Sequence, residues 1–257
     1  MKKLLLGAVV GIFGIASASA ADLPLKAPVV MPVAPNWTGF YVGLHAGWAW
    51  NSLSATTTSI TTDLFGFPTN HGLNRNGPVY GAQGGYNVQF SNWVLGIEGD
   101  FSGVHANGTS TVDVLPNVVP VIPRGSATIT SEVEWLASIR GRLGLTWGAG
   151  LVYITGGYAA AGVSHTGSYN VVTPFIASAA LSAKDTQTGW VFGGGYENQL
   201  TGNWTVRAEY LYYSLGGKTT STNIAHNVTI PPFPATLNHT WSDLHIQTLR
   251  LGFNYKL

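Results

Sequence analysis

Residues 204–213 read Trp-Thr-Val-Arg-Ala-Glu-Tyr-Leu-Tyr-Tyr, and their side chains alternate between apolar and polar. Trp204, Val206 and Ala208 share one face of an extended chain, because successive side chains of a β-strand point to opposite sides. The same period of two recurs along the chain, in residues 40–51, 80–90, 93–101, 133–145, 152–160, 187–197 and 248–257. Segments of about ten residues are long enough to cross a bilayer when tilted. The sequence therefore predicts eight strands of membrane-spanning length.

The position of the aromatic side chains favours a membrane barrel over a soluble β-sandwich, whose strands also alternate. Aromatic residues lie near the strand ends on the apolar face, at Trp48, Trp50, Tyr80, Phe90, Trp93, Trp135, Trp147, Trp204, Tyr210 and Tyr212. Connections after the second, fourth and sixth strands are short, whereas the others are expected to be loops of about 20 to 27 residues. Aromatic girdles, short periplasmic turns and long external loops are typical of outer-membrane barrels. We predict an all-β, eight-stranded antiparallel up-and-down transmembrane β-barrel, with both termini in the periplasm.

The composition excludes several classes of protein. Only 9 % of the 257 residues are Asp, Glu, Lys or Arg, and the mean hydropathy is +0.17. Disordered chains need low hydropathy and high charge, and nucleic-acid-binding domains need a basic surface. The longest apolar run, residues 4–16, is shorter than the roughly 20 residues of a membrane-spanning helix. Because cysteine is absent, the chain has neither disulfides nor a thiolate for catalysis or metal binding.

The N-terminal segment is expected to lie outside the barrel. Lys2 and Lys3 precede the apolar run, and Ala18-Ser19-Ala20 follows it, so residues 1–20 are predicted to be a cleaved secretory signal peptide. Prolines at positions 24, 28, 32 and 35 predict an extended, proline-rich periplasmic tether over residues 21–36. The barrel domain then covers residues 37–257. We expect export to the outer membrane of a Gram-negative bacterium.

Parts of the chain resemble the Omp25/Omp31 family of small, porin-like outer-membrane β-barrel proteins of alphaproteobacteria. The resemblance rests on residues 21–24 (ADLP), 36–43 (NWTGFYVG), 202–213 (GNWTVRAEYLYY) and 249–257 (LRLGFNYKL). It implies a surface antigen that stabilises the cell envelope, and some members are described as porins or hemin binders; the family supplies no catalytic residues. It also implies an assembly signal at Phe253, Tyr255 and Leu257. Members usually end in Phe, and Leu257 departs from that pattern.

Charged residues recur on the predicted lumen faces of the strands. They are Glu98, Asp100, Arg140, Arg142, Glu197, Arg207, Glu209 and Arg250. Counting from the short turns places Glu98 level with Arg140 and Arg142, Glu197 opposite Arg207, and Glu209 level with Arg250. A charge in a narrow lumen is costly unless it is paired and hydrogen-bonded. We therefore predict a ladder of ion pairs that fills the bore; separately hydrated charges lining a wet pore are the alternative.

Histidine is concentrated in the predicted external loops or at their roots. The six residues are His71, His105, His165, His226, His239 and His245. Neutral imidazoles there could ligate hemin iron or a divalent metal, although no two have ligand spacing and solvated loop histidines are the ordinary alternative. No resident cofactor is expected, and hemin bound at these histidines is the alternative.

Other local patterns give no sign of enzymatic activity. Ser242-Asp243-x-His245 is the densest cluster of catalytic residue types, but the sequence supplies no partner for it, so the chain is not expected to be an enzyme. The glycine-rich residues 193–195 and 81–85 lack the strand–loop–helix context of a phosphate-binding loop. Close packing inside a narrow barrel is the expected role of these glycines.

These features predict a structural outer-membrane barrel and surface-exposed antigen that stabilises the cell envelope. The expected partners are outer-membrane lipid, lipopolysaccharide and the outer-membrane assembly machinery, and not nucleic acid. The alternatives are a narrow passive porin for small solutes and a hemin-binding surface receptor. Eight strands leave an interior just wide enough for side chains to fill, which disfavours a wide channel.

Overall fold

The computed structural model describes residues 36–59, 69–114, 124–172, 177–217, 219–224 and 235–257. For the described residues that fall within 52–74, 112–127, 169–181 and 218–241, only the backbone is described. The predicted signal peptide and all but the last residue of the predicted tether lie outside the described residues. The described part of the chain contains no helix that is long and apolar enough to cross a membrane.

The described residues form ten β-strands in one antiparallel sheet. The strands are β1 (Gly39–Ser59), β2 (Thr69–Phe90), β3 (Trp93–Val114), β4 (Arg124–Trp147), β5 (Gly150–Val172), β6 (Ala177–Gln199), β7 (Trp204–Leu215), β8 (Thr219–Ile224), β9 (Ala235–Trp241) and β10 (Leu244–Lys256). Consecutive strands pair from β1 to β7, and β10 pairs with both β7 and β1. These eight strands therefore close into a ring. β8 and β9 form a hairpin, in which β9 continues alongside β1 beyond the end of β10.

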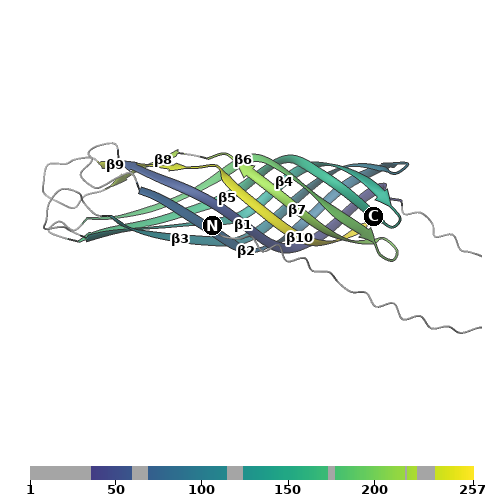
Figure 1. Ribbon diagram of the computed structural model, residues 1–257, viewed down its shortest axis with the longest axis horizontal. Helices are drawn as coiled ribbons and strands as arrows, with labels where there is room; N and C mark the ends of the chain where they lie inside the picture. Colours follow the sequence, from purple (N-terminus) through teal and green to yellow (C-terminus); the bar gives the residue numbers. More distant parts are fainter. Residues whose placement is uncertain (1–35, 60–68, 115–123, 173–176, 218, 225–234) are drawn as a thin grey trace, which may run out of the picture. The chain divides into compact units, whose positions relative to one another are not determined.

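The strand registers fix the stagger of the ring. Asn51 on β1 pairs with Ile246, and following the paired residues through β10, β7, β6, β5, β4, β3 and β2 returns to β1 at Tyr41. The circuit ends 51 − 41 = 10 residues further down the same strand, and such a stagger requires tilted strands. The strands cross obliquely in Figure 1, with β8 and β9 at the end opposite the C-terminus. The eight-stranded antiparallel barrel predicted from the sequence is confirmed.

The three short connections gather at one end of the barrel, which we call the turn end. Two residues join β2 to β3 and β4 to β5, and residues 200–203 join β6 to β7. Ser91, Gly148 and Gly202 have φ angles of 54°, 59° and 65°, and tight hairpin turns require such positive φ values. The prediction of short turns after these strands is confirmed. The opposite end of the barrel is called the far end below.

The prediction of long loops at the far end is wrong for three of the four connections, because the strands continue through most of those residues. The fourth connection, residues 216–243 between β7 and β10, keeps about the predicted length and contains the short strands β8 and β9. The segments between β1 and β2, β3 and β4, and β5 and β6 are reduced to residues 60–68, 115–123 and 173–176. The extensions are rich in threonine, a residue that favours strands. Cross-strand hydroxyl contacts join Thr109 to Thr130 at 3.1 Å and Thr111 to Thr128 at 3.2 Å. Polar strands of this kind lack the apolar alternation from which the spanning strands were predicted.

The predicted faces of the strands are confirmed, with one exception at a β-bulge in β4. Outward side chains such as Leu44, Ile139 and Leu251 are exposed, whereas the alternate positions are buried. The sequence pattern placed Val133 outside and Glu134 inside, but Val133 is fully buried and Glu134 is exposed. The register shifts between Val133 and Trp135. A bulge inserts one extra residue, so the two faces exchange beyond it.

Glycines allow the lumen to be packed closely, and a matched pair of alanine substitutions tests this. A Cβ atom at Gly81 would overlap the carbonyl oxygen of Phe101 and lie 2.7 Å from the Cα atom of Ser102. At Gly99, on the neighbouring strand, the nearest atom would be the Ser138 carbonyl oxygen at 3.8 Å. We expect Gly81→Ala to lower the free energy of unfolding by about 1–3 kcal/mol, as overpacking does, and Gly99→Ala to leave it nearly unchanged. Urea unfolding in lipid vesicles measures both, and equal effects would contradict the close approach.

Candidate functional site in the barrel lumen

Eight charged side chains form one cluster inside the barrel, which we call the lumen network. Its members are Glu98, Asp100, Arg140, Arg142, Glu197, Arg207, Glu209 and Arg250. They come from β3, β4, β6, β7 and β10, and the exposed fraction of each side chain is 4 % or less. Four arginines face four carboxylates, so the formal charges of the network cancel. Its members are the residues of the predicted charge ladder.

The ion pairs of the lumen network cross the bore as well as joining neighbouring strands. Arg140 on β4 contacts Glu98 on the adjacent strand β3, and its Nη1 atom lies 3.1 Å from Oε1 of Glu209 on β7. Arg207, also on β7, reaches back to Glu98, with 2.5 Å between Nη1 and Oε2. β3 and β7 are not neighbours in the ring. The side chains therefore cross the interior of the barrel. They fill the bore instead of forming ion pairs only between neighbouring strands along the wall.

Two of the three expected pairings form, and the third is exchanged. Glu98 and Arg140 are register partners and form an ion pair, as do Glu209 and Arg250, whose Oε2 and Nη2 atoms are 2.6 Å apart. Glu197 is the register partner of Arg207 but forms its ion pair with Arg142 on β4. Arg207 is directed across the bore to Glu98 instead. Register alone does not predict this exchange, because long arginine side chains can reach strands that are not adjacent.

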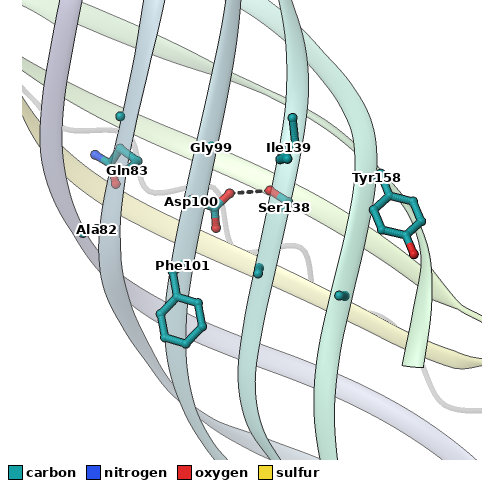
Figure 2. Close-up of a pocket in the computed structure, with 11 residues that line it drawn as sticks. Ala82, Gln83, Gly99, Asp100, Phe101, Ser138, Ile139 and Tyr158 are labelled. Atoms are coloured by element: carbon teal, nitrogen blue, oxygen red, sulfur yellow. Dashed lines mark hydrogen bonds between the residues drawn. The ribbon is translucent and has the colours of Figure 1, made fainter. Parts of the chain in front are cut away.

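Neutral side chains complete the hydrogen bonding of the carboxylates. Asp100 accepts a hydrogen bond from Ser138 on the adjacent strand at 2.5 Å, a contact drawn as a dashed line in Figure 2. Nη1 of Arg250 lies 3.1 Å from Oδ2 of the same carboxylate. The tyrosine hydroxyls of Tyr41 and Tyr153 donate to Glu98 at 2.6 Å and to Glu209 at 3.1 Å. The guanidinium of Arg142 also lies 3.7 Å from the centroid of the Tyr153 ring.

Glu197, nearest the turn end, is held in the same manner. Thr205 donates to its Oε1 atom at 2.5 Å, and Asn254 donates to the same oxygen at 2.7 Å. Sequence reasoning did not assign a role to these neutral residues or to Tyr41 and Tyr153. The alternation nevertheless places all four on lumen faces, which was the available signal.

On the far-end side of the lumen network the bore is filled by apolar side chains, which we call the apolar layer. Along β7, Leu211 and Leu215 follow Glu209, and along β10 Leu244 and Ile246 precede Arg250. The cluster is fully or almost fully buried and comprises Ala49, Val79, Val104, Ala106, Ile129, Val133, Leu136, Ala159, Ala161, Val163, Val191, Leu211, Tyr213, Leu215, Leu244 and Ile246. The charge ladder predicted from the sequence does not extend into this part of the bore. Charged side chains therefore occupy the bore at one level, and apolar side chains occupy it at the next level toward the far end.

The described histidines of the predicted hemin or metal set do not meet at one place. His105 stacks on Tyr80 and His245 stacks on Tyr212, with ring centroids 5.8 Å apart in both pairs. Both histidines alternate with buried neighbours and therefore face outward. His165 is buried in the lumen, where Nδ1 lies 2.7 Å from the hydroxyl of Ser131. His226 and the side chains of His71 and His239 lie outside the described residues. Among the residues whose side chains are described, no group of three potential metal ligands occurs.

Comparison with known proteins identifies the family to which this chain belongs. Residues 8–256 match the family model described as outer membrane protein beta-barrel domain. The 31 kDa outer-membrane immunogenic protein of Brucella melitensis is 32 % identical over the full length of both chains. The chain belongs to the Omp25/Omp31 family of outer-membrane β-barrel proteins. Two further members are the 25 kDa outer-membrane immunogenic protein of Brucella abortus, 26 % identical over 79 % of each chain, and the 22 kDa outer membrane protein of Rhizobium leguminosarum bv. viciae, 30 % identical over 82 % of this chain and 85 % of that protein.

Membership of the Omp25/Omp31 family places the barrel in the outer membrane of a Gram-negative bacterium, and its surface fits that location. The outward side chains between the two aromatic girdles are apolar and exposed, with exposed fractions of 69 % for Leu44 and 62 % for Leu251. In water such a surface would cause aggregation, whereas in a bilayer it contacts lipid. The relatives named above are described as outer-membrane or immunogenic proteins, and none is described as an enzyme.

Proposed function

We propose that this protein is a closed, structural outer-membrane barrel that stabilises the cell envelope and presents its far end as a surface antigen. The proposal rests on one observation: the bore is filled by the lumen network and, next to it, by the apolar layer. A protein that conducts solutes needs a continuous water-filled path through the bore. The lumen network and the apolar layer both interrupt such a path. The same filling gives the wall a rigid interior.

The two layers oppose conduction for different reasons. In the lumen network each arginine is within ion-pair distance of a carboxylate, so no unbalanced row of charges lines a water column. In the apolar layer, side chains such as Leu211 and Ile246 are fully buried. Apolar constrictions exclude water and therefore ions. A solute would have to displace both layers.

The antigen part of the proposal is supported by the relatives and by the strand extensions. The two Brucella relatives are described as immunogenic. β1 to β6 extend past the aromatic girdle at Trp50 and Tyr80 toward the far end. Periplasmic turns are short in outer-membrane barrels, so the far end is the side that would face the exterior. Lipopolysaccharide is the expected neighbour there, and the assembly signal at Phe253, Tyr255 and Leu257 would be read by the assembly machinery during insertion.

Conductance across a planar lipid bilayer tests the proposal. We expect the purified barrel to give no steady openings, whereas steady nanosiemens-scale openings would show that it is a porin. Insertion must be demonstrated in the same preparation, by protection of the barrel from protease in vesicles. Repeating the recording with hemin present tests the receptor alternative, and a titration with loop-histidine variants shows whether any hemin affinity depends on those residues.

A further inference from the structure

Arg75 is a buried arginine that stands apart from the lumen network. It lies on β2, on the far-end side of Val79 in the apolar layer, and none of its surface is exposed. Among the described residues, none offers a hydrogen-bond partner to any of its three side-chain nitrogens. No described carboxylate lies within ion-pair distance of it, and the four carboxylates of the lumen network are bound to the four arginines described above.

The register partner of Arg75 is equally unsatisfied. Asn51 on β1 pairs with Arg75 and is 7 % exposed. Neither polar atom of its side-chain amide has a hydrogen-bond partner in the part of the chain that the structure describes. Its partner on the other side is Ile246, which is fully buried, and Ala49 lies on the same face of β1. Two polar side chains on adjacent strands therefore lie next to the apolar layer, and their hydrogen-bond donors are unused.

An unpaired charge in such a place is costly. Arginine stays protonated in proteins, so it cannot escape the cost by losing its proton. A buried charge without a partner destabilises the fold by several kcal/mol unless an opposite charge compensates it. The planar guanidinium presents donors in a fork that matches the oxygens of a carboxylate or phosphate. The amide of Asn51 supplies a further donor for the same group.

We propose that Arg75 and Asn51 form a binding site for an oxyanion, a phosphate or carboxylate group that enters the lumen from the far end. The apolar layer beneath the site stops the anion from passing further. The positive charge excludes cations, and the low dielectric of the surroundings strengthens the attraction for the anion. The site does not depend on whether the bore conducts, so its test is separate from the conductance measurement.

Stability in different anions tests the site. The full barrel is refolded in detergent without lipopolysaccharide, and its urea midpoint is measured in chloride, inorganic phosphate and acetate at constant ionic strength. A ligand that binds only the folded state raises the midpoint with the logarithm of its concentration. We expect phosphate or acetate to do so for the natural sequence. Arg75→Met should abolish the shift and be at least as stable in chloride, because it removes the uncompensated charge. Asn51→Leu should reduce the shift.

Lys184→Met is the matched control, since it removes an exposed cation that pairs with Glu134 on the outer wall. It should retain the full anion shift. Lipopolysaccharide with and without its phosphates forms the second arm of the experiment. If only lipopolysaccharide raises the urea midpoint, the bound anionic group belongs to that molecule. If inorganic phosphate or acetate raises it, the site takes a free anion. If no anion shifts the midpoint, or if Arg75→Met shifts as much as the natural sequence, the proposal is wrong.

Discussion

Replacing Glu209 with alanine is expected to lower the free energy of unfolding in lipid vesicles by about 3–5 kcal/mol, the cost of breaking a buried ion pair. Glu209 lies 2.6 Å from Arg250, 3.1 Å from Arg140 and 3.8 Å from Arg207, and it accepts a hydrogen bond from Tyr153. Its removal leaves a net positive charge in the lumen network, where the side chains of Arg140 and Arg250 are 2 % exposed or less. Urea unfolding followed by tryptophan fluorescence measures the loss.

A double-mutant cycle separates the ion pair from the loss of packing. Glu209→Ala, Arg250→Ala and the double variant should show a coupling energy, because the two side chains are in direct contact. The matched control is Glu134→Ala, which breaks the exposed 2.9 Å pair with Lys184. Exposed pairs contribute about 0–1 kcal/mol. If Glu209→Ala costs no more than this control and the cycle shows no coupling, the lumen network does not hold the barrel together.

The fold could be predicted because a membrane barrel imposes a simple rule on its sequence. Side chains that face lipid must be apolar, so every spanning strand shows a period of two, and the short turns separate the strands clearly. Beyond the girdle the strands meet water, and the rule no longer applies. The Thr109–Thr130 contact belongs to such a region, and the sequence pattern there looks like a loop. The bulge at Glu134 was also hidden, because one inserted residue leaves no compositional trace.

The members of the lumen network could be predicted from the sequence, but only two of its three expected ion pairs could. Burial makes isolated charges costly, so charges on lumen faces imply partners, and Glu209–Arg250 follows directly from strand register. The partner of Glu197 depends on how arginine side chains cross the bore, which no register specifies. The apolar layer was not predicted, because the lumen faces were interpreted from their charged residues alone. Apolar residues at lumen positions, such as Leu211, were assigned no role.

Placing an arginine at Ile97 is expected to cost about 2–4 kcal/mol of folding into lipid, as charged residues do on the lipid face near the bilayer midplane. Ile97 is 58 % exposed on the outer wall, between the two aromatic girdles, and its register partner on β4 is Gly141. The glycine offers no side chain to pair with the new charge. Leu95, Val206 and Ala208 share this outward band and should behave similarly. Urea unfolding in lipid vesicles measures the cost.

The depth dependence of that cost distinguishes lipid exposure from simple disruption of the wall. Ala149 is exposed in the two-residue turn between β4 and β5, at the turn end of the barrel. An arginine there lies near the membrane interface, where charged substitutions cost about 0–1 kcal/mol. Because both variants introduce the same side chain, the difference between them reports the position of the hydrocarbon region. If Ile97→Arg and Ala149→Arg cost the same, the band between the girdles does not lie in the hydrocarbon core.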